Sequence, residues 1–96
     1  MTKEFQRRRD VLVSGLNGIP GLSCFNPQGA FYAWCNVSAL GASSDAIAAR
    51  WLEEALVATV PGEGFGAPGF IRLSFATSMD TIDQALTRLA AWLKQQ

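Results

Sequence analysis

The chain has 96 residues, of which 49% are hydrophobic, with eight acidic and eight basic side chains and no histidine. This composition is too apolar for a disordered segment, and the length suits one globular domain. The balanced charge creates no basic field for nucleic acid or anionic membrane, so neither is expected as a partner.

Two cysteines, Cys24 and Cys35, fall in what look like adjacent strands. Without histidine they cannot complete a Cys/His zinc site, so we expect two buried free thiols in a reducing cytosol and no metal. No run approaches the roughly 20 apolar residues that a membrane span needs, and the segment MTKEFQRRRD lacks the apolar part of a secretory signal. We therefore expect a cytoplasmic location.

The first predicted element is a helix whose pattern is already under way at residue 2, so we expect the natural protein to extend further upstream. Its apolar face carries Phe5, Leu12 and Leu16. Glycines and a proline between residues 18 and 21 end this helix. Residues 22–37 then predict a β-hairpin, because aromatic and β-branched residues lie on either side of the turn at 26–29.

A second helix follows, capped by Ser43 or Ser44, and it ends near Leu56. Its apolar residues recur at helical spacing and are Ile47, Trp51, Leu52 and Ala55. The run LVATV at 56–60 predicts a short strand, and a Gly/Pro loop spans 61–69. The run FIRLSF at 70–75 predicts a further strand, and Thr77 or Ser78 caps a last helix with an apolar stripe.

This order of elements predicts one domain over residues 1–96. Its fold class is α/β of the two-layer α+β kind, with helices layered against a small mixed or antiparallel sheet.

Arg72 is the first candidate functional residue. Alternation along 70–75 places Ile71, Leu73 and Phe75 on one face of the strand and Arg72 on the other. The strand follows the glycine-rich loop VPGEGFGAPG, where a ligand can approach the backbone closely. A guanidinium there can bind a carboxylate through two parallel hydrogen bonds. The alternative is a solvated arginine on the open face of a sheet.

The loop GEGFGA formally matches the dinucleotide-binding pattern G-x-G-x-x-G/A. Pro68 and a β-run follow it, where a helix should begin to hold the phosphates, so nucleotide binding is not favoured. The chain also pairs no nucleophile with a base. No catalytic residue is therefore assigned.

Five segments in order resemble the C-terminal small domain of class I/II aminotransferases, pyridoxal-phosphate enzymes of fold type I, and most closely the bacterial aspartate aminotransferases. The segments are FQRRRDVLVSGLN with IPG, PQGAFYAW, VATVPGEGFG, IRLSFA and DQALTRL. The resemblance covers nearly the whole chain. It implies that Arg72 binds the α-carboxylate of an amino-acid substrate, and that Phe65 lines the rim of the substrate cleft.

The resemblance further implies pyridoxal phosphate in the full-length enzyme, held by a lysine, an aspartate and phosphate-binding residues of a large domain that has no counterpart here. Lys3 and Lys94 lie outside any such motif. No cofactor-binding residue is therefore assigned, and the isolated chain is predicted to bind no cofactor and to be inactive. The implied partners are an amino acid and a 2-oxo acid, the missing large domain, and a second copy in a homodimer.

Two alternatives stay open. The chain could be the small domain of another fold type I pyridoxal-phosphate enzyme, such as a carbon–sulfur lyase, because these enzymes share the fold and the mode of carboxylate binding. It could instead be a stand-alone α/β module that binds protein through an apolar face. We expect Phe31, Tyr32 and Trp34 to serve sheet packing rather than substrate contact. The sequence does not identify which amino acid is the substrate.

Overall fold

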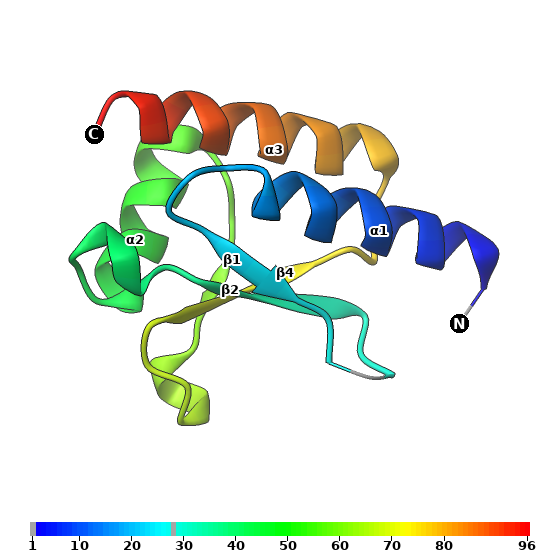
Figure 1. Cartoon of the computed structure of the whole chain (residues 1–96), viewed down its shortest axis with the longest axis horizontal. Helices are drawn as coiled ribbons and strands as arrows, with labels where there is room; N and C mark the ends of the chain where they lie inside the picture. Colours follow the sequence, from blue (N-terminus) through cyan, green and yellow to red (C-terminus); the bar gives the residue numbers. More distant parts are fainter. Residues whose placement is uncertain (1, 28) are drawn as a thin grey trace.

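The computed structural model describes residues 2–27 and 29–96. Within them, four strands form one antiparallel sheet in the order β1-β2-β4-β3, and α1 and α3 lie side by side over one of its faces (Figure 1). The elements are α1 (Lys3–Asn17), β1 (Ser23–Phe25), β2 (Tyr32–Asn36), α2 (Ser44–Arg50), β3 (Val60–Pro61), β4 (Phe70–Ser74) and α3 (Met79–Lys94). The predicted helices on a small antiparallel sheet are confirmed.

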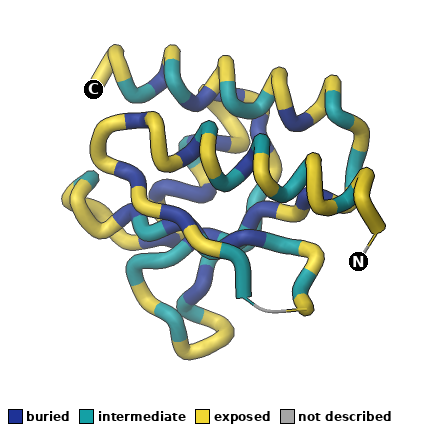
Figure 2. Tube along the Cα trace, turned by 45° about the vertical axis from the view of Figure 1, so that its right-hand side comes forward, coloured by how far each residue is buried: buried dark blue, intermediate teal, exposed yellow. Residues whose placement is uncertain are grey.

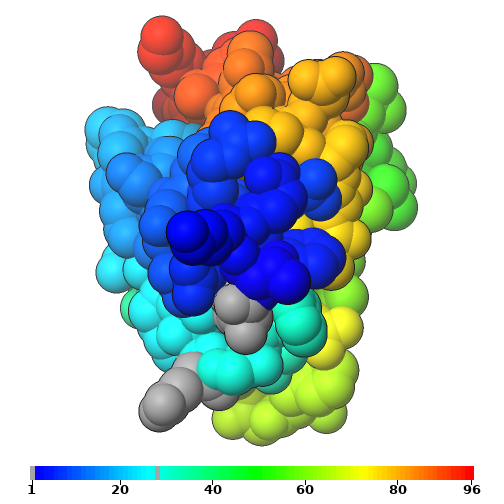
Figure 3. Space-filling view, turned by 90° about the vertical axis from the view of Figure 1, so that its right-hand side faces the viewer, coloured from blue at the N-terminus to red at the C-terminus, as the bar shows by residue number. Residues whose placement is uncertain are grey.

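The helix predicted to be under way at residue 2 begins at Lys3 as α1, because Thr2 has an extended backbone and its hydroxyl caps the helix by accepting a hydrogen bond from the Phe5 amide at 3.3 Å. Seen from its amino end, α1 (blue) occupies the middle of the surface, with α3 (orange) above it and the region of the hairpin (cyan) below (Figure 3), and it contacts α3, β1 and β2. A Cβ on Gly15 would lie only 2.6 Å from Cδ1 of Leu86. Glycine at this position therefore lets α1 and α3 approach closely.

The hairpin predicted at 22–37 is confirmed as β1 and β2, although its turn includes residue 28, which lies outside the described residues. Cys24 pairs with Cys35 across the two strands, and both thiols are buried and free, as expected. The neighbouring Cys24 thiol and burial both raise the pKa of Cys35, so this thiol stays protonated.

The second helix is capped by Ser43, whose hydroxyl accepts from the Ala46 amide at 3.1 Å. It continues into a π-helical turn, Trp51–Ala55, and ends at Leu56, as predicted. The expectation that Leu52 belongs to its apolar face is wrong, since this side chain is 55% exposed. The π-helical turn contains one residue more than an α-helical turn, so the side chains in and after it point to a different face of the helix than α-helical spacing predicts.

The strand predicted at 56–60 is wrong over most of its length, because only Val60 of that run enters the sheet. Leu56 takes a left-handed conformation with φ 59°, and the Val57 amide then donates back to the Trp51 carbonyl at 3.0 Å. These residues therefore complete the end of the preceding helix and do not pair with β4.

The hydrophobic core lies between the helices and one face of the sheet (Figure 2). Helix α3 is capped by Ser78, one of the two predicted residues, and it contributes the buried side chains Ile82, Leu89 and Trp92. Trp92 packs edge-on against Trp51 at 6.2 Å between ring centroids. Among the residues described, no helix is long and apolar enough to cross a membrane.

Candidate functional site

The face of the sheet that points away from α1 and α3 is lined by aromatic side chains around one arginine. Tyr32 and Trp34 of β2 and Phe70 and Arg72 of β4 are half-buried there, whereas the residues that alternate with them in both strands are buried against the helices. Trp34 stands directly opposite Arg72 in the antiparallel pairing. We call this surface, which also includes Phe65, the open face.

The Arg72 guanidinium lies between two rings of the open face. Its Cζ atom is 4.9 Å from the ring centroid of Tyr32 and 5.2 Å from that of Phe65, which are distances of cation–π contact. None of the ion pairs within residues 2–27 and 29–96 includes Arg72. The rings therefore orient a permanent cation whose N–H donors remain available to an external carboxylate.

Arg50 shows how differently another arginine of this chain is arranged. It also lies over a ring, with Cζ 4.8 Å from the centroid of Trp92, but its Nε is 3.3 Å from a carboxylate oxygen of Glu54. The ring contact alone therefore does not distinguish Arg72. Its distinction is the ring contact without an internal carboxylate.

Phe65 reaches the open face because the loop after β3 is closed by backbone hydrogen bonds. The Gly62 amide donates to the Phe70 carbonyl at 2.8 Å, and the Ala67 amide donates to the Gly62 carbonyl at 2.9 Å. A Cβ on Gly62 would lie 2.3 Å from the Ala67 oxygen, so only glycine fits here. The resulting 3₁₀ turn, Glu63–Phe65, leaves Phe65 59% exposed at the rim.

The structure brings the two residues predicted from the sequence, Arg72 and Phe65, into contact, and it adds Tyr32 and Trp34. Tyr32 and Trp34 pack on the sheet, as expected, with ring centroids 5.7 Å apart, but they do so on the open face, the face that carries Arg72, and not in the core. Phe31 does pack as expected, with its ring 5.2 Å from that of Phe5 on α1.

Glu63 is a further residue of this region that the sequence did not indicate. Its carboxylate accepts hydrogen bonds from the amide of Ser44 at 3.0 Å and from the Ser44 hydroxyl. The bond from Ser44 lowers the pKa of Glu63, so the carboxylate is ionised at neutral pH. The loop that carries Phe65 is thereby attached to the start of α2.

The glycine loop has no helix after it. The segment that follows Pro68 is strand β4, so the open face offers no helix N-terminus for a pyrophosphate, in agreement with the sequence prediction. Among the described residues, no three His, Cys, Asp or Glu side chains gather where they could hold a metal ion. The chemistry of this face is therefore that of a cation among aromatic rings.

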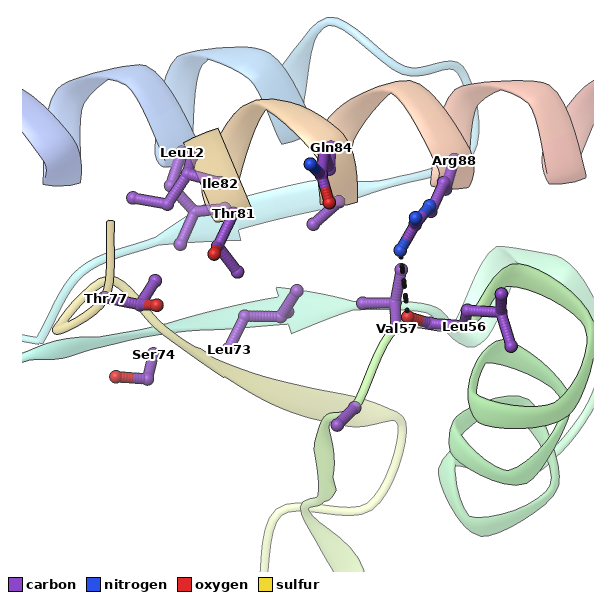
Figure 4. Close-up of a pocket in the computed structure, with 12 residues that line it drawn as sticks. Leu12, Leu56, Val57, Leu73, Ser74, Thr77, Thr81, Ile82, Gln84 and Arg88 are labelled. Carbon is purple, nitrogen blue, oxygen red and sulfur yellow. Dashed lines mark hydrogen bonds between the residues drawn. The ribbon is translucent and has the colours of Figure 1, made fainter. Parts of the chain in front are cut away.

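A separate cleft of about 340 Å³ lies between α3, the segment 56–58 and the end of β4 (Figure 4). Leu12, Leu73 and Ile82 give it an apolar lining. Its arginine, Arg88, donates to the Leu56 carbonyl at 3.5 Å. This cleft is suited to apolar groups, and we do not assign the carboxylate site to it.

Residues 1–89 match the family described as aminotransferase class I and II. The aspartate aminotransferase of Geobacillus stearothermophilus is 41% identical over 98% of this chain. A crystal structure of an aromatic aminotransferase from Pyrococcus horikoshii superposes with a TM-score of 0.91 at 37% identity over 97% of this chain and 25% of that one. The aspartate aminotransferase of Thermus thermophilus with maleate gives 0.82 at 44% identity over 91% of this chain and 22% of that one.

The sheet and helices described above thus form part of the aminotransferase fold. The chain belongs to the class I and II aminotransferases. It spans about 25% of the length of the aspartate aminotransferase from Geobacillus stearothermophilus.

The family implies pyridoxal phosphate in the full enzyme. The lysines of this chain, Lys3 and Lys94, lie at the outer ends of α1 and α3, at opposite ends of the molecule (Figure 1). Neither lysine belongs to the strands or the loop that carry Arg72 and Phe65. The described residues therefore do not fit the cofactor by themselves.

Proposed function

We propose that this chain is the C-terminal small domain of a pyridoxal-phosphate aminotransferase and that its open face binds the carboxylate of an amino-acid or 2-oxo-acid substrate. The observation that carries the proposal is the Arg72 guanidinium, which two rings hold on a half-buried surface without an internal carboxylate. The large domain, the cofactor lysine and a dimer partner belong to the rest of the enzyme, which we place in the cytoplasm. The chain alone is then inactive.

Arg72 suits this role because of where its charge lies. The rings of Tyr32 and Phe65 restrict the guanidinium, so less rotational freedom is lost when a carboxylate binds. Two parallel hydrogen bonds from a planar guanidinium fix the carboxylate in position and angle. A substrate oriented in this way presents its α-carbon at one place, where the cofactor supplies the electron sink for amino-group exchange.

The relatives are all aminotransferases, but the side chains of their substrates differ. One solved relative is described with maleate, a dicarboxylate, while another is described as an aromatic aminotransferase. What their amino-acid substrates share is the α-carboxylate. We therefore propose that this chain contributes the carboxylate-binding site, while the preference for one amino-acid side chain over another depends on residues elsewhere in the enzyme.

The decisive experiment replaces Arg72 in the natural full-length protein. Arg72→Ala should lower kcat/KM for an L-amino acid by the equivalent of about 2–5 kcal/mol, with a raised KM, since the charge pair with the substrate carboxylate is lost. The amine formed from the same amino acid by decarboxylation should be turned over no worse. Arg72→Lys should recover part of the loss, because an ammonium cannot form the bidentate pair.

Arg50→Ala is the matched control, because Arg50 also lies over an aromatic ring but is already paired with Glu54. It should leave the preference for the amino acid over the amine unchanged. If Arg72→Ala also leaves that preference unchanged, the carboxylate site lies elsewhere and the proposal is wrong.

A protein-binding module is the competing proposal for the same surface. Phe25 at the edge of the open face is 51% exposed, and its ring lies 6.1 Å from that of Phe70. A module of this kind would bind through the rings, so Arg72→Ala would change binding little. The Arg72 experiment therefore separates the two functions.

A further inference from the structure

The glycine loop is attached to a helix through one carboxylate. Oε1 of Glu63 accepts from the backbone amide of Ser44 at 3.0 Å, and Oε2 accepts from the Ser44 hydroxyl. Ser44 is fully buried, although serines are mostly exposed in proteins, and it is the first residue of α2. The contact therefore joins two parts of the chain through a polar side chain that is removed from water.

The start of α2 favours this carboxylate electrostatically. The first amides of a helix lack intrahelical acceptors, and the positive end of the helix dipole attracts an anion. The Ser43 hydroxyl already accepts from the Ala46 amide, and Glu63 takes the Ser44 amide that remains. Between them, the serine cap and Glu63 satisfy two of the free donors of α2.

The same turn carries Phe65, the ring that lies against Arg72. Glu63 and Phe65 belong to one 3₁₀ turn, in which the Phe65 amide donates to the Gly62 carbonyl at 2.9 Å. Phe65 lies between Gly64 and Gly66, which restrict the backbone least of all residues. The backbone bonds close this loop on itself, and the Glu63 carboxylate attaches the closed loop to α2.

We propose that Glu63 is a positioning residue of the carboxylate site. Its carboxylate fixes the loop to α2, the loop places the Phe65 ring 5.2 Å from Cζ of Arg72, and the ring holds the guanidinium in its binding orientation. This inference rests on the proposed function of Arg72. It adds a residue that touches neither substrate nor cofactor and acts only through Phe65.

The test compares variants of the natural full-length protein. The readout is the preference for the L-amino acid that is turned over fastest relative to the amine that lacks its carboxylate, expressed as the ratio of their kcat/KM values. Glu63→Ala should reduce this preference by roughly 10- to 100-fold, mainly through the KM of the amino acid, because a misplaced binding group loses its geometry. Glu63→Gln, which can still accept from the Ser44 amide, should restore most of it.

A double-mutant cycle with Phe65→Ala tests the route of the effect. If Glu63 acts through the Phe65 ring, Glu63→Ala should change the preference much less in the Phe65→Ala background than in the natural protein. Glu53→Ala, at an exposed glutamate of the π-helical turn, is the control and should change nothing. Ser44→Ala removes one donor of the contact and serves as the second variant if Glu63→Ala does not fold.

The possible outcomes separate the inference from the proposal beneath it. Equal losses of kcat/KM for the amino acid and the amine would show that Glu63 only stabilises the fold. Fully additive effects of Glu63→Ala and Phe65→Ala on the preference would show the same. Either result overturns the inference. A preference lowered by Arg72→Ala but untouched by Glu63→Ala also overturns the inference and leaves the carboxylate site intact. A preference untouched by Arg72→Ala overturns both.

Discussion

The two faces of the same sheet have different roles in this domain: one packs into the core, and the other carries the proposed binding surface. On the face covered by helices, Ile71 and Leu73 of β4 are buried beside Ala33 and Cys35 of β2. On the open face, Tyr32, Trp34, Phe70 and Arg72 alternate with them and are only half-buried. A strand that reverses its side-chain direction at every residue can thus serve the core and a binding surface at once.

This difference predicts which property a substitution on each face should change, stability or carboxylate binding. Removing atoms from the covered face creates a cavity in packed surroundings, whereas the open face already borders space that a ligand can fill. Stability should therefore depend on the first face and carboxylate binding on the second. Neighbouring residues of β4 allow this separation to be measured.

Ile71→Ala should produce the largest loss of stability. Ile71 is fully buried between β4 and the helices, so the substitution should lower the free energy of unfolding by about 2–5 kcal/mol. Arg72→Ala, one residue further along on the open face, should lower it by less than about 1 kcal/mol. Urea denaturation of the 96-residue chain measures both. A loss at Arg72 as large as that at Ile71 would contradict the division between the faces.

Gly62→Ala should come next, because it disturbs the loop between β3 and β4 that carries Phe65. The added Cβ would meet backbone oxygens of Ala67 and Phe70 at 2.3 and 2.7 Å, and neither can move without breaking the loop. We expect a loss of roughly 1–3 kcal/mol in unfolding free energy, as for overpacked sites. The Phe65 ring should also leave Arg72, which NMR chemical shifts of the guanidinium group would report. Gly64→Ala is the control, since a Cβ there meets nothing within 4 Å.

Leu56→Gly should have a smaller effect of opposite sign. Leu56 has φ 59° and is 68% exposed, so it bears the strain of a left-handed backbone and buries little. Glycine should raise the free energy of unfolding by about 0.5–1 kcal/mol, because it adopts this conformation without steric cost. Leu52→Gly, at a similarly exposed leucine within the helical turn, should lower it by about 1 kcal/mol. Equal signs in thermal or urea unfolding would refute the strain argument.

Features that depend on neighbouring residues could be predicted from the sequence. The alternation in FIRLSF predicted that Arg72 lies on the other face of the strand from Ile71 and Leu73, because successive side chains of a strand point to opposite faces. The cap residues Ser43 and Ser78 each lay within a predicted pair, since capping needs a particular side chain at a helix start.

Features that depend on distant partners could not be predicted. The side of the sheet on which Tyr32 and Trp34 lie follows from the register that sets Trp34 opposite Arg72, which no local pattern specifies. Glu63 looks like a solvated loop residue until the fold brings it to Ser44, 19 positions earlier. The strand at 56–60 failed for a local reason instead, because Leu56 takes a left-handed conformation and the Val57 amide bonds to the Trp51 carbonyl at the end of the preceding helix.

Glu54 offers the smallest and most specific test, at the contact between the π-helical turn and α3. Its carboxylate accepts from the indole nitrogen of Trp92 at 2.9 Å and from Arg50 at 3.3 Å, and these bonds lower the pKa of Glu54 below its usual value of 4.5. A carboxyl whose pKa is lower in the folded state stabilises the fold above the unfolded pKa and loses that contribution as the pH falls through the folded value.

Glu54→Gln should therefore be slightly less stable than the natural chain at neutral pH, and the gap should close as the pH falls below about 4.5. Urea denaturation followed by tryptophan fluorescence measures this gap, because Trp92 is buried beside the carboxylate. Glu53→Gln, at the exposed neighbour, should leave the pH dependence unchanged. A gap that stays constant below pH 4.5 would mean that Glu54 acts through the shape of its hydrogen bonds and not through its charge. The contact between the π-helical turn and α3 would then not depend on the charge of Glu54, in contrast to the role proposed for Arg72 on the open face.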